Sequence, residues 1–170
     1  MLRVIFDTNI YGKLALEPNG KRLEERILNE KEFIVYGYDP IRKELRKVPK
    51  TTKLSKRNRI ILLNLYDKLT GNHLLPNSIK VNHLAKKYFD YYQHLGGGYT
   101  WHSSIKYDFM IVACASIHGL DIIYSADNKT MTNKTALKSY DHINLKSYYR
   151  TPRFLRYEEL TEQFRNYSKS

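Results

Sequence analysis

The sequence predicts an α/β fold built on a short parallel sheet with helices on both of its faces. Short runs of apolar, β-branched and aromatic residues alternate along the chain with longer stretches of helical periodicity. This alternation is typical of parallel strands joined by helical crossovers. The 170 residues contain no internal repeat and no linker-like stretch, so residues 1–170 are expected to form a single domain.

The expected strands are short and buried. The opening run from Leu2 to Phe6 is almost entirely apolar and stops abruptly at Asp7, Thr8 and Asn9, which reads as a buried strand ending in oxygen-bearing side chains. In open α/β sheets this carboxyl edge is where ligands are held. The remaining expected strands cover residues 33–36, 122–124 and 143–145.

Capping residues mark several of the expected helices. Asp39 and Pro40 open one helix, and Pro49 ends it. Ser104, or the serine before it, caps another that stops at Gly119. The expected helices cover residues 9–16, 20–29, 40–48, 56–69, 81–95, 104–118, 134–139 and 157–164.

The charge balance points to a polyanionic partner. The formal net charge is +12 and the isoelectric point is about 9.6, which is more than solubility requires. Much of the excess is local, since nine basic residues between 42 and 59 are opposed only by Glu44. A solvated basic face is the alternative interpretation. The residues predicted to bind RNA are Lys43, Arg46, Lys47, Lys50, Arg57 and Lys129.

Other features exclude several classes of protein. No apolar run approaches membrane-spanning length, and the N-terminus does not resemble a secretion signal, so a cytoplasmic location without a membrane partner is expected. The single Cys114 excludes an intrachain disulfide. The six histidines show no ligand pairing and there is no cysteine cluster, so a zinc site is not expected.

Two expected helices carry an acid at the edge of their apolar stripe. Glu44 follows this pattern in the helix after Pro40, and Asp108 follows it in the helix before Gly119. A carboxylate in this position requires a partner or a metal ion. A local ion pair for each acid, with a neighbouring lysine, is the alternative interpretation.

Four carboxylates are therefore candidates for one cation site. Asp7 and Asp127 follow strands, while Glu44 and Asp108 lie on core-edge helices. Hard oxygen ligands of this kind suit Mg²⁺ or Mn²⁺. The side chains predicted to orient these acids from a second shell are Thr8, Asn9, Ser125 and Asn128; for Thr8 and Asn9 an ordinary helix cap is also compatible.

The order of these motifs resembles the PIN-domain nucleases, in particular the compact single-domain kind that includes the VapC toxins. The resemblance rests on Asp7-Thr-Asn after a strand, Glu44 in Ile-x-x-Glu-Leu, Asp108 in Asp-Phe-x-Ile-Val-Ala-Cys-Ala, and Ser-Ala-Asp127-Asn after a strand. It covers residues 1 to about 145. It implies a three-layer α/β/α sandwich and a Mg²⁺- or Mn²⁺-dependent endoribonuclease, with Asp7 and Asp108 as central ligands and Glu44 and Asp127 acting through water or at a second ion.

The resemblance leaves several alternatives open. Many of these nucleases have a further acid two residues after the position of Asp127, where this chain has Lys129; either a second metal site is weakened or Lys129 contacts the substrate phosphate.

A basic helical arm is expected around 50–99 and a C-terminal helical tail around 150–170. Three functions remain compatible with the sequence. The first is the toxin of a toxin–antitoxin pair, with a protein antitoxin as partner and a homodimer as its assembly. The others are a housekeeping RNA-processing nuclease and a non-catalytic RNA-binding or partner-binding module.

Overall fold

A parallel sheet forms the centre of the molecule. The computed structural model describes residues 1–47 and 56–166. Within them the strands are β1 (Leu2–Phe6), β2 (Phe33–Tyr38), β3 (Leu74–Leu75), β4 (Ile122–Tyr124) and β5 (Arg153–Leu155). They are ordered β3-β2-β1-β4-β5, and every described pair is parallel.

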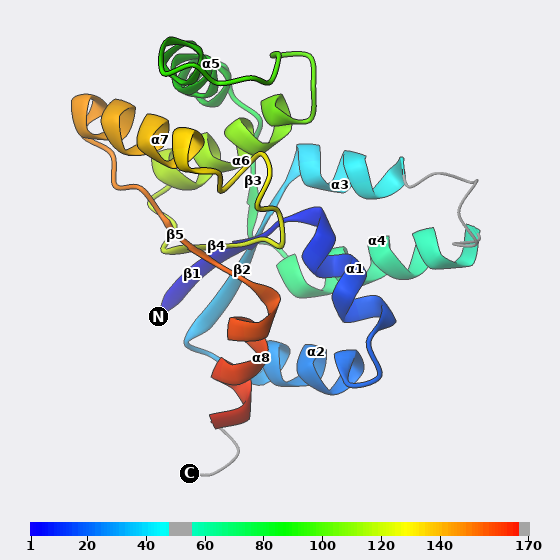
Figure 1. Ribbon diagram of the computed structural model, residues 1–170. Helices are drawn as coiled ribbons and strands as arrows, with labels where there is room; N and C mark the ends of the chain where they lie inside the picture. The colour runs from blue at the N-terminus through cyan, green and yellow to red at the C-terminus, as the bar shows by residue number, and fades with distance from the viewer. Residues whose placement is uncertain (48–55, 167–170) are drawn as a thin grey trace.

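Helices cover both faces of this sheet. The described helices are α1 (Thr8–Leu16), α2 (Gly20–Asn29), α3 (Asp39–Arg46), α4 (Lys56–Thr70), α5 (Ile79–His94), α6 (Ile105–Ile117), α7 (Lys134–Ser147) and α8 (Tyr157–Asn166). Figure 1 shows α5, α6 and α7 on one side of the sheet, and α1, α2, α4 and α8 on the other. The predicted three-layer α/β/α sandwich of PIN-like architecture, with a short parallel sheet, is confirmed.

The central strand β1 sets the position of the first predicted acid. Val4, Ile5 and Phe6 are fully buried, because β1 lies between β2 and β4 and is covered by helices on both faces. Phe6 pairs in register with Tyr124 of β4. The residues that follow these two strands therefore lie side by side at the carboxyl edge of the sheet.

One predicted strand is wrong. Residues 143–145 continue α7 instead of forming a strand, and the edge strand next to β4 is β5. A short apolar run does not distinguish a strand from a helix turn. Here Tyr140 and Asn144 are buried four positions apart while Leu145 is 79% exposed, which fits helical spacing. The Asn133 side chain caps the helix by accepting from the amide of Ala136. The two-residue strand β3 was also not predicted.

The two stretches predicted as an arm and a tail both contribute to the layers. In the first, α4 packs against α1, α3 and β2, and α5 packs against α6 and α7; residues 48–55 lie outside the described part. In the second, β5 pairs with β4 and α8 packs on α2. Among the described residues, no helix combines the length and apolar character needed to cross a membrane.

Candidate functional site

Asp7 lies at the junction between β1 and α1. It is 4% exposed and caps α1, accepting at Oδ1 from the amide of Thr8 at 2.7 Å. Because Asp is a favoured N-cap residue, a strand that leads directly into a helix accommodates an acid at this position. Burial raises the pKa of the Asp7 carboxyl, and the hydrogen bonds from Ser125 and Thr8 only partly oppose this.

Two of the predicted orienting residues hold the second oxygen of Asp7. Asn9 Nδ2 and Ser125 Oγ each donate to Asp7 Oδ2 at 2.7 Å. Asn9 also accepts from the amide of Ala126 at 3.0 Å, which ties the loop after β4 to the start of α1. The in-register pairing of β1 with β4 thus places the residues that hold the Asp7 carboxylate in a fixed orientation.

Asp108 projects from the first turn of α6. It is 8% exposed, on a helix whose surrounding residues are almost all buried. Its Oδ2 accepts a hydrogen bond from the hydroxyl of Thr130. Burial raises the pKa of Asp108 to about 8, a bond from Thr130 opposes this, and the charges of Asp7, Asp127 and Glu44 raise it further.

Asp127 organises the loop that follows β4. Its Oδ1 accepts from the amides of Lys129 and Thr130 at 2.7 and 2.9 Å, and its Oδ2 accepts from the Thr130 hydroxyl at 2.6 Å. Burial raises the pKa of Asp127, but the bonds from Thr130 and Lys129 outweigh it, so the pKa is lowered. Asp127 is therefore the most readily ionised of the buried or half-buried acids here.

The Thr130 hydroxyl joins two acids with a single proton. It lies within hydrogen-bonding distance of both Asp108 and Asp127, but a hydroxyl donates only one hydrogen at a time. One carboxylate oxygen is therefore left without that donor unless Asp108 itself is protonated. The raised pKa of Asp108 agrees with this arrangement.

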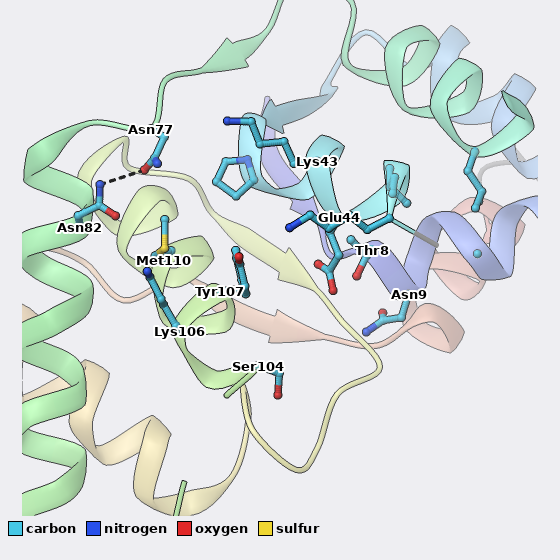
Figure 2. A pocket seen from close by; sticks show the side chains of 15 residues that line it. Thr8, Asn9, Lys43, Glu44, Asn77, Asn82, Ser104, Lys106, Tyr107 and Met110 are labelled. Carbon is cyan, nitrogen blue, oxygen red and sulfur yellow. Dashed lines mark hydrogen bonds between the residues drawn. The ribbon is translucent and has the colours of Figure 1, made fainter. Parts of the chain in front are cut away.

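Glu44 approaches the other acids from α3 but is more open than predicted. The residue is exposed, and Figure 2 shows its carboxylate pointing toward Thr8 and Asn9. Loss of solvent at the carboxyl raises the pKa of Glu44, the Asp7 charge raises it further, and the Thr8 hydroxyl and Lys47 oppose the rise. The four carboxylates therefore share one electrostatic environment at the carboxyl edge of the sheet.

The donor chemistry fits a hard cation that keeps part of its water shell. Among the side chains that the structure describes, none of the four carboxylates forms an ion pair with a Lys or Arg, so the local-ion-pair interpretation is not supported there. The same residues contain no group of three or more His, Cys, Asp or Glu placed to hold an ion directly. Mg²⁺ commonly binds through one or two carboxylates and retains several waters, which suits two buried acids with two more nearby.

A groove of about 820 Å³ opens beside these acids. Its wall comprises Thr8, Asn9, Gly12, Pro40, Lys43, Glu44, Leu45, Lys47, Leu62, Asn77, Asn82, Ser104, Lys106, Tyr107 and Met110. Most of the exposed surface of this wall is apolar. Figure 2 shows Asn77 and Asn82 at one side of the groove and Glu44, Thr8 and Asn9 at the other. The size is within the range of small-ligand sites.

The predicted RNA-binding residues divide into two sets. Lys43 and Lys47 line the groove, although Lys43 also pairs with Asp39 at 2.6 Å. Arg46 and Lys129 are exposed outside it. Lys50 lies outside the described residues, and nothing is described of the side chain of Arg57 within α4.

Sequence reasoning missed several residues of this site. Thr130 carried a signal, because an Asp followed three residues later by Thr is a pattern that forms local side-chain turns. Asn77 and Asn82 lie around the start of α5, and Lys106 and Tyr107 lie in α6, so no local pattern grouped the two pairs. Conversely, the predicted orienting residue Asn128 does not join the acids: it is exposed, and its Oδ1 accepts from Arg156 at 3.0 Å.

Comparison with known proteins yields similarity of structure alone. No family model and no curated protein matches the chain. Among solved structures, VapBC2 from Rickettsia felis bound to a promoter DNA fragment has a TM-score of 0.60 at 11% identity, covering 91% of this chain and 98% of that one. DNA-bound VapBC from Salmonella typhimurium has a TM-score of 0.59 at 16% identity, covering 92% and 99%. FitAcB from Neisseria gonorrhoeae has a TM-score of 0.56 at 19% identity, covering 89% and 96%.

These findings correct one prediction. The identification as a PIN-domain nuclease of the VapC-like kind was wrong, because the similar structures are VapBC and FitAcB complexes and no nuclease family matches. The four motifs describe where acids stand in an α/β fold, and strands ending at one edge place acids there in chains of different descent and function. The arrangement of the acids stands on its own geometry.

Proposed function

We propose that this protein is a metal-dependent endoribonuclease that hydrolyses RNA phosphodiester bonds with Mg²⁺ or Mn²⁺. The observation that carries the proposal is the pair Asp7 and Asp108, two buried carboxylates from different elements that face one end of the sheet. Neither has an ion-pair partner among the described residues. Buried acids that repel one another are stabilised when a cation binds between them.

Each residue of the site has a specific role in this proposal. Asp7 and Asp108 would hold the cation, and Glu44 and Asp127 would contact it through water. Asn9 and Ser125 orient Asp7 through the bonds at 2.7 Å. A bound Mg²⁺ or Mn²⁺ supplies a water of lowered pKa and stabilises charge on the phosphoryl group.

The reaction balances as a hydrolysis. A water oxygen bonds to phosphorus, one phosphorus–oxygen ester bond breaks, and the departing sugar oxygen takes a proton from the solvent. The proton lost by the water passes to Glu44, which lines the groove and whose pKa is raised, as a general base requires. Lys43 and Lys47 bind the neighbouring phosphates.

The surroundings of Asp127 favour a single ion. Both of its oxygens already accept hydrogen bonds from its own loop, and Lys129 lowers its pKa through a positive charge. A second metal ion beside Asp127 would be repelled by the positive charge of Lys129. We therefore assign one ion, held mainly by Asp7 and Asp108.

The comparisons support one extension of the proposal. The similar structures are complexes, two of them with DNA, so we propose that this chain also works with a protein partner, as the nuclease of a toxin–antitoxin pair. A partner of this kind would silence the activity. Protein purified under denaturing conditions and refolded without any partner is therefore the sample of choice.

The test is cleavage of a fluorescently labelled single-stranded RNA by this partner-free protein. Cleavage should require Mn²⁺ or Mg²⁺ and stop in EDTA. Asp7→Asn and Asp108→Asn should each lower the rate by more than about 100-fold, beyond the 10- to 100-fold typical of outer-shell changes. Asp141→Asn is the matched control, since Asp141 is exposed, and should cleave like the wild type.

Two results would contradict the proposal. Cleavage that continues in EDTA, or in both variants, would show that another protein or another site is responsible. RNA binding without cleavage in either metal would instead identify a non-catalytic RNA-binding module of the same fold.

A further inference from the structure

Two asparagines at one end of the groove present a donor and an acceptor side by side. Asn82 Nδ2 donates to Asn77 Oδ1 at 3.3 Å and to the carbonyl of Ser78 at 3.0 Å. Asn77 Oδ1 also accepts from the Tyr38 hydroxyl at 2.9 Å. These bonds settle which way each amide faces, and Figure 2 shows the pair joined at the edge of the groove.

The remaining two amide groups lack a partner in the part of the chain that the structure describes. Among the described residues, Asn77 Nδ2 and Asn82 Oδ1 form no hydrogen bond. Both residues line the groove. The fold therefore places the amide donor Asn77 Nδ2 beside the carbonyl acceptor Asn82 Oδ1. The hydroxyl of the buried Tyr38 holds the Asn77 amide in position.

An exposed aromatic ring lies along the same groove. Tyr107 is 42% exposed and lines the wall from the first turn of α6, immediately before Asp108. Exposed aromatic rings next to basic residues bind bases by stacking. Lys106 also lines the groove, and its Nζ lies 5.7 Å from the ring centroid of Trp101.

The charge of the wall favours a polyanion over an apolar segment. Three lysines, Lys43, Lys47 and Lys106, line the groove, against one acid, Glu44. A wall with a mostly apolar floor, a basic rim and a donor–acceptor pair matches a nucleotide, which has a flat apolar face, a phosphate and a hydrogen-bonding edge.

We propose that this groove seats one unpaired base of the RNA substrate, stacked on Tyr107 with its Watson–Crick edge on Asn77 Nδ2 and Asn82 Oδ1. This rests on the proposed function and adds its substrate class. A base whose edge is occupied by the two amides cannot be paired with another strand, so the substrate is single-stranded at this point. Because Glu44, Thr8 and Asn9 line the same groove, the seated base lies near the acids that hold the cation in the proposed function.

The experiment measures binding separately from cleavage. Fluorescence anisotropy in EDTA at constant salt gives the dissociation constants of labelled six-nucleotide strands of A, C, G and U, and of a matched RNA duplex. The strands should bind more tightly than the duplex. Tyr107→Ala should weaken strand binding by about 5- to 150-fold, the range typical of the loss of one base stack, whereas Tyr107→Phe should stay near the wild type.

The amide pair has its own variant and control. Asn82→Ala should reduce the differences in dissociation constant between the A, C, G and U strands, because it removes the acceptor at the base edge. Tyr148→Ala is the control for Tyr107→Ala, since Tyr148 is 96% exposed and does not line the groove. Tyr107→Leu serves as a second variant that removes the ring but keeps an apolar side chain.

The outcomes separate this inference from the proposed function. Unchanged strand affinity in Tyr107→Ala and Tyr107→Leu, or unchanged base preference in Asn82→Ala, would overturn the base seat and leave the groove as a face for a protein partner. Equal binding of strand and duplex would also overturn it. Loss of cleavage with these binding effects intact would instead contradict the nuclease and leave the base seat standing.

Discussion

At the residue scale, the Asp108 carboxyl makes the folded protein sensitive to pH. Its pKa is raised to about 8 in the folded state, against about 3.9 for an Asp side chain in an unfolded chain. Between these values the folded state holds a proton that the unfolded state has released. Stability therefore falls as the pH rises through this window, and Asp7 and Glu44, whose pKa values are also raised, act in the same direction.

Asp108→Asn should remove the largest part of this dependence. Without added metal, the melting temperature of the wild type should fall between pH 5 and pH 8, and that of the variant should fall much less. At pH 8 the variant should melt several degrees higher, since about 1 kcal/mol shifts the melting temperature of a chain of this size by about 2–4 °C. Calorimetry across the pH range measures this, and a variant that melts lower than the wild type at pH 8 would contradict the sign.

At the element scale, α5, α6 and α7 are joined by a buried polar network centred on Asn144. Its Oδ1 accepts from the Tyr88 hydroxyl at 2.5 Å, and its Nδ2 donates to the hydroxyls of Ser116 and Thr151, both at 3.0 Å. The network crosses the helical layer that carries Asp108 on α6. It thus fixes the helix that presents one of the two central acids.

Asn144→Ala should lower the free energy of unfolding by about 2–4 kcal/mol, because it leaves several buried groups without hydrogen bonds and opens a cavity. Urea denaturation followed by circular dichroism measures the change. Lys146→Ala, an exposed position on the same helix, is the control and should change stability by less than about 0.5 kcal/mol. A loss for Asn144→Ala no larger than that of the control would show that the network contributes nothing.

At the scale of the whole molecule, the net charge of +12 should make RNA binding strongly dependent on salt. Each phosphate neutralised by a lysine releases counterions, so the logarithm of affinity falls linearly with the logarithm of salt concentration. Lys43 and Lys47 lie in the groove beside the acids, so they should take a direct part in this dependence.

Replacing both Lys43 and Lys47 with Ala should reduce the magnitude of that slope by about 1.4, from roughly 0.7 for each single-strand phosphate contact. Titrations of labelled RNA at a series of KCl concentrations measure it. The control replaces Lys31 and Lys146, two exposed lysines that do not line the groove, and should leave the slope nearly unchanged. Equal slopes for the groove variant and the wild type would show that RNA takes another path.

The sequence by itself determined the fold class, the order of most elements and the positions of the acids. These are local properties: Phe6 followed by Asp7 reads as a strand ending at a cap, and Asp108 lies at the edge of an apolar helical stripe. The strand predicted at residues 143–145 was wrong for the same reason. A three-residue pattern gives no information about the buried hydrogen-bond partners of Asn144, which hold this segment in a helix.

Only the tertiary structure decided which side chains meet. The pairing of Phe6 with Tyr124 brings Ser125 to Asp7 across 118 positions of the chain, and a loop brings the Thr130 hydroxyl to Asp108. The groove likewise unites Asn77, Asn82 and Tyr107. Contacts at such separations depend on strand register and helix packing, which no short stretch of sequence contains. The acids and the supporting residues Asn9 and Ser125 could therefore be named from the sequence, while Thr130 and the groove beside the acids could not.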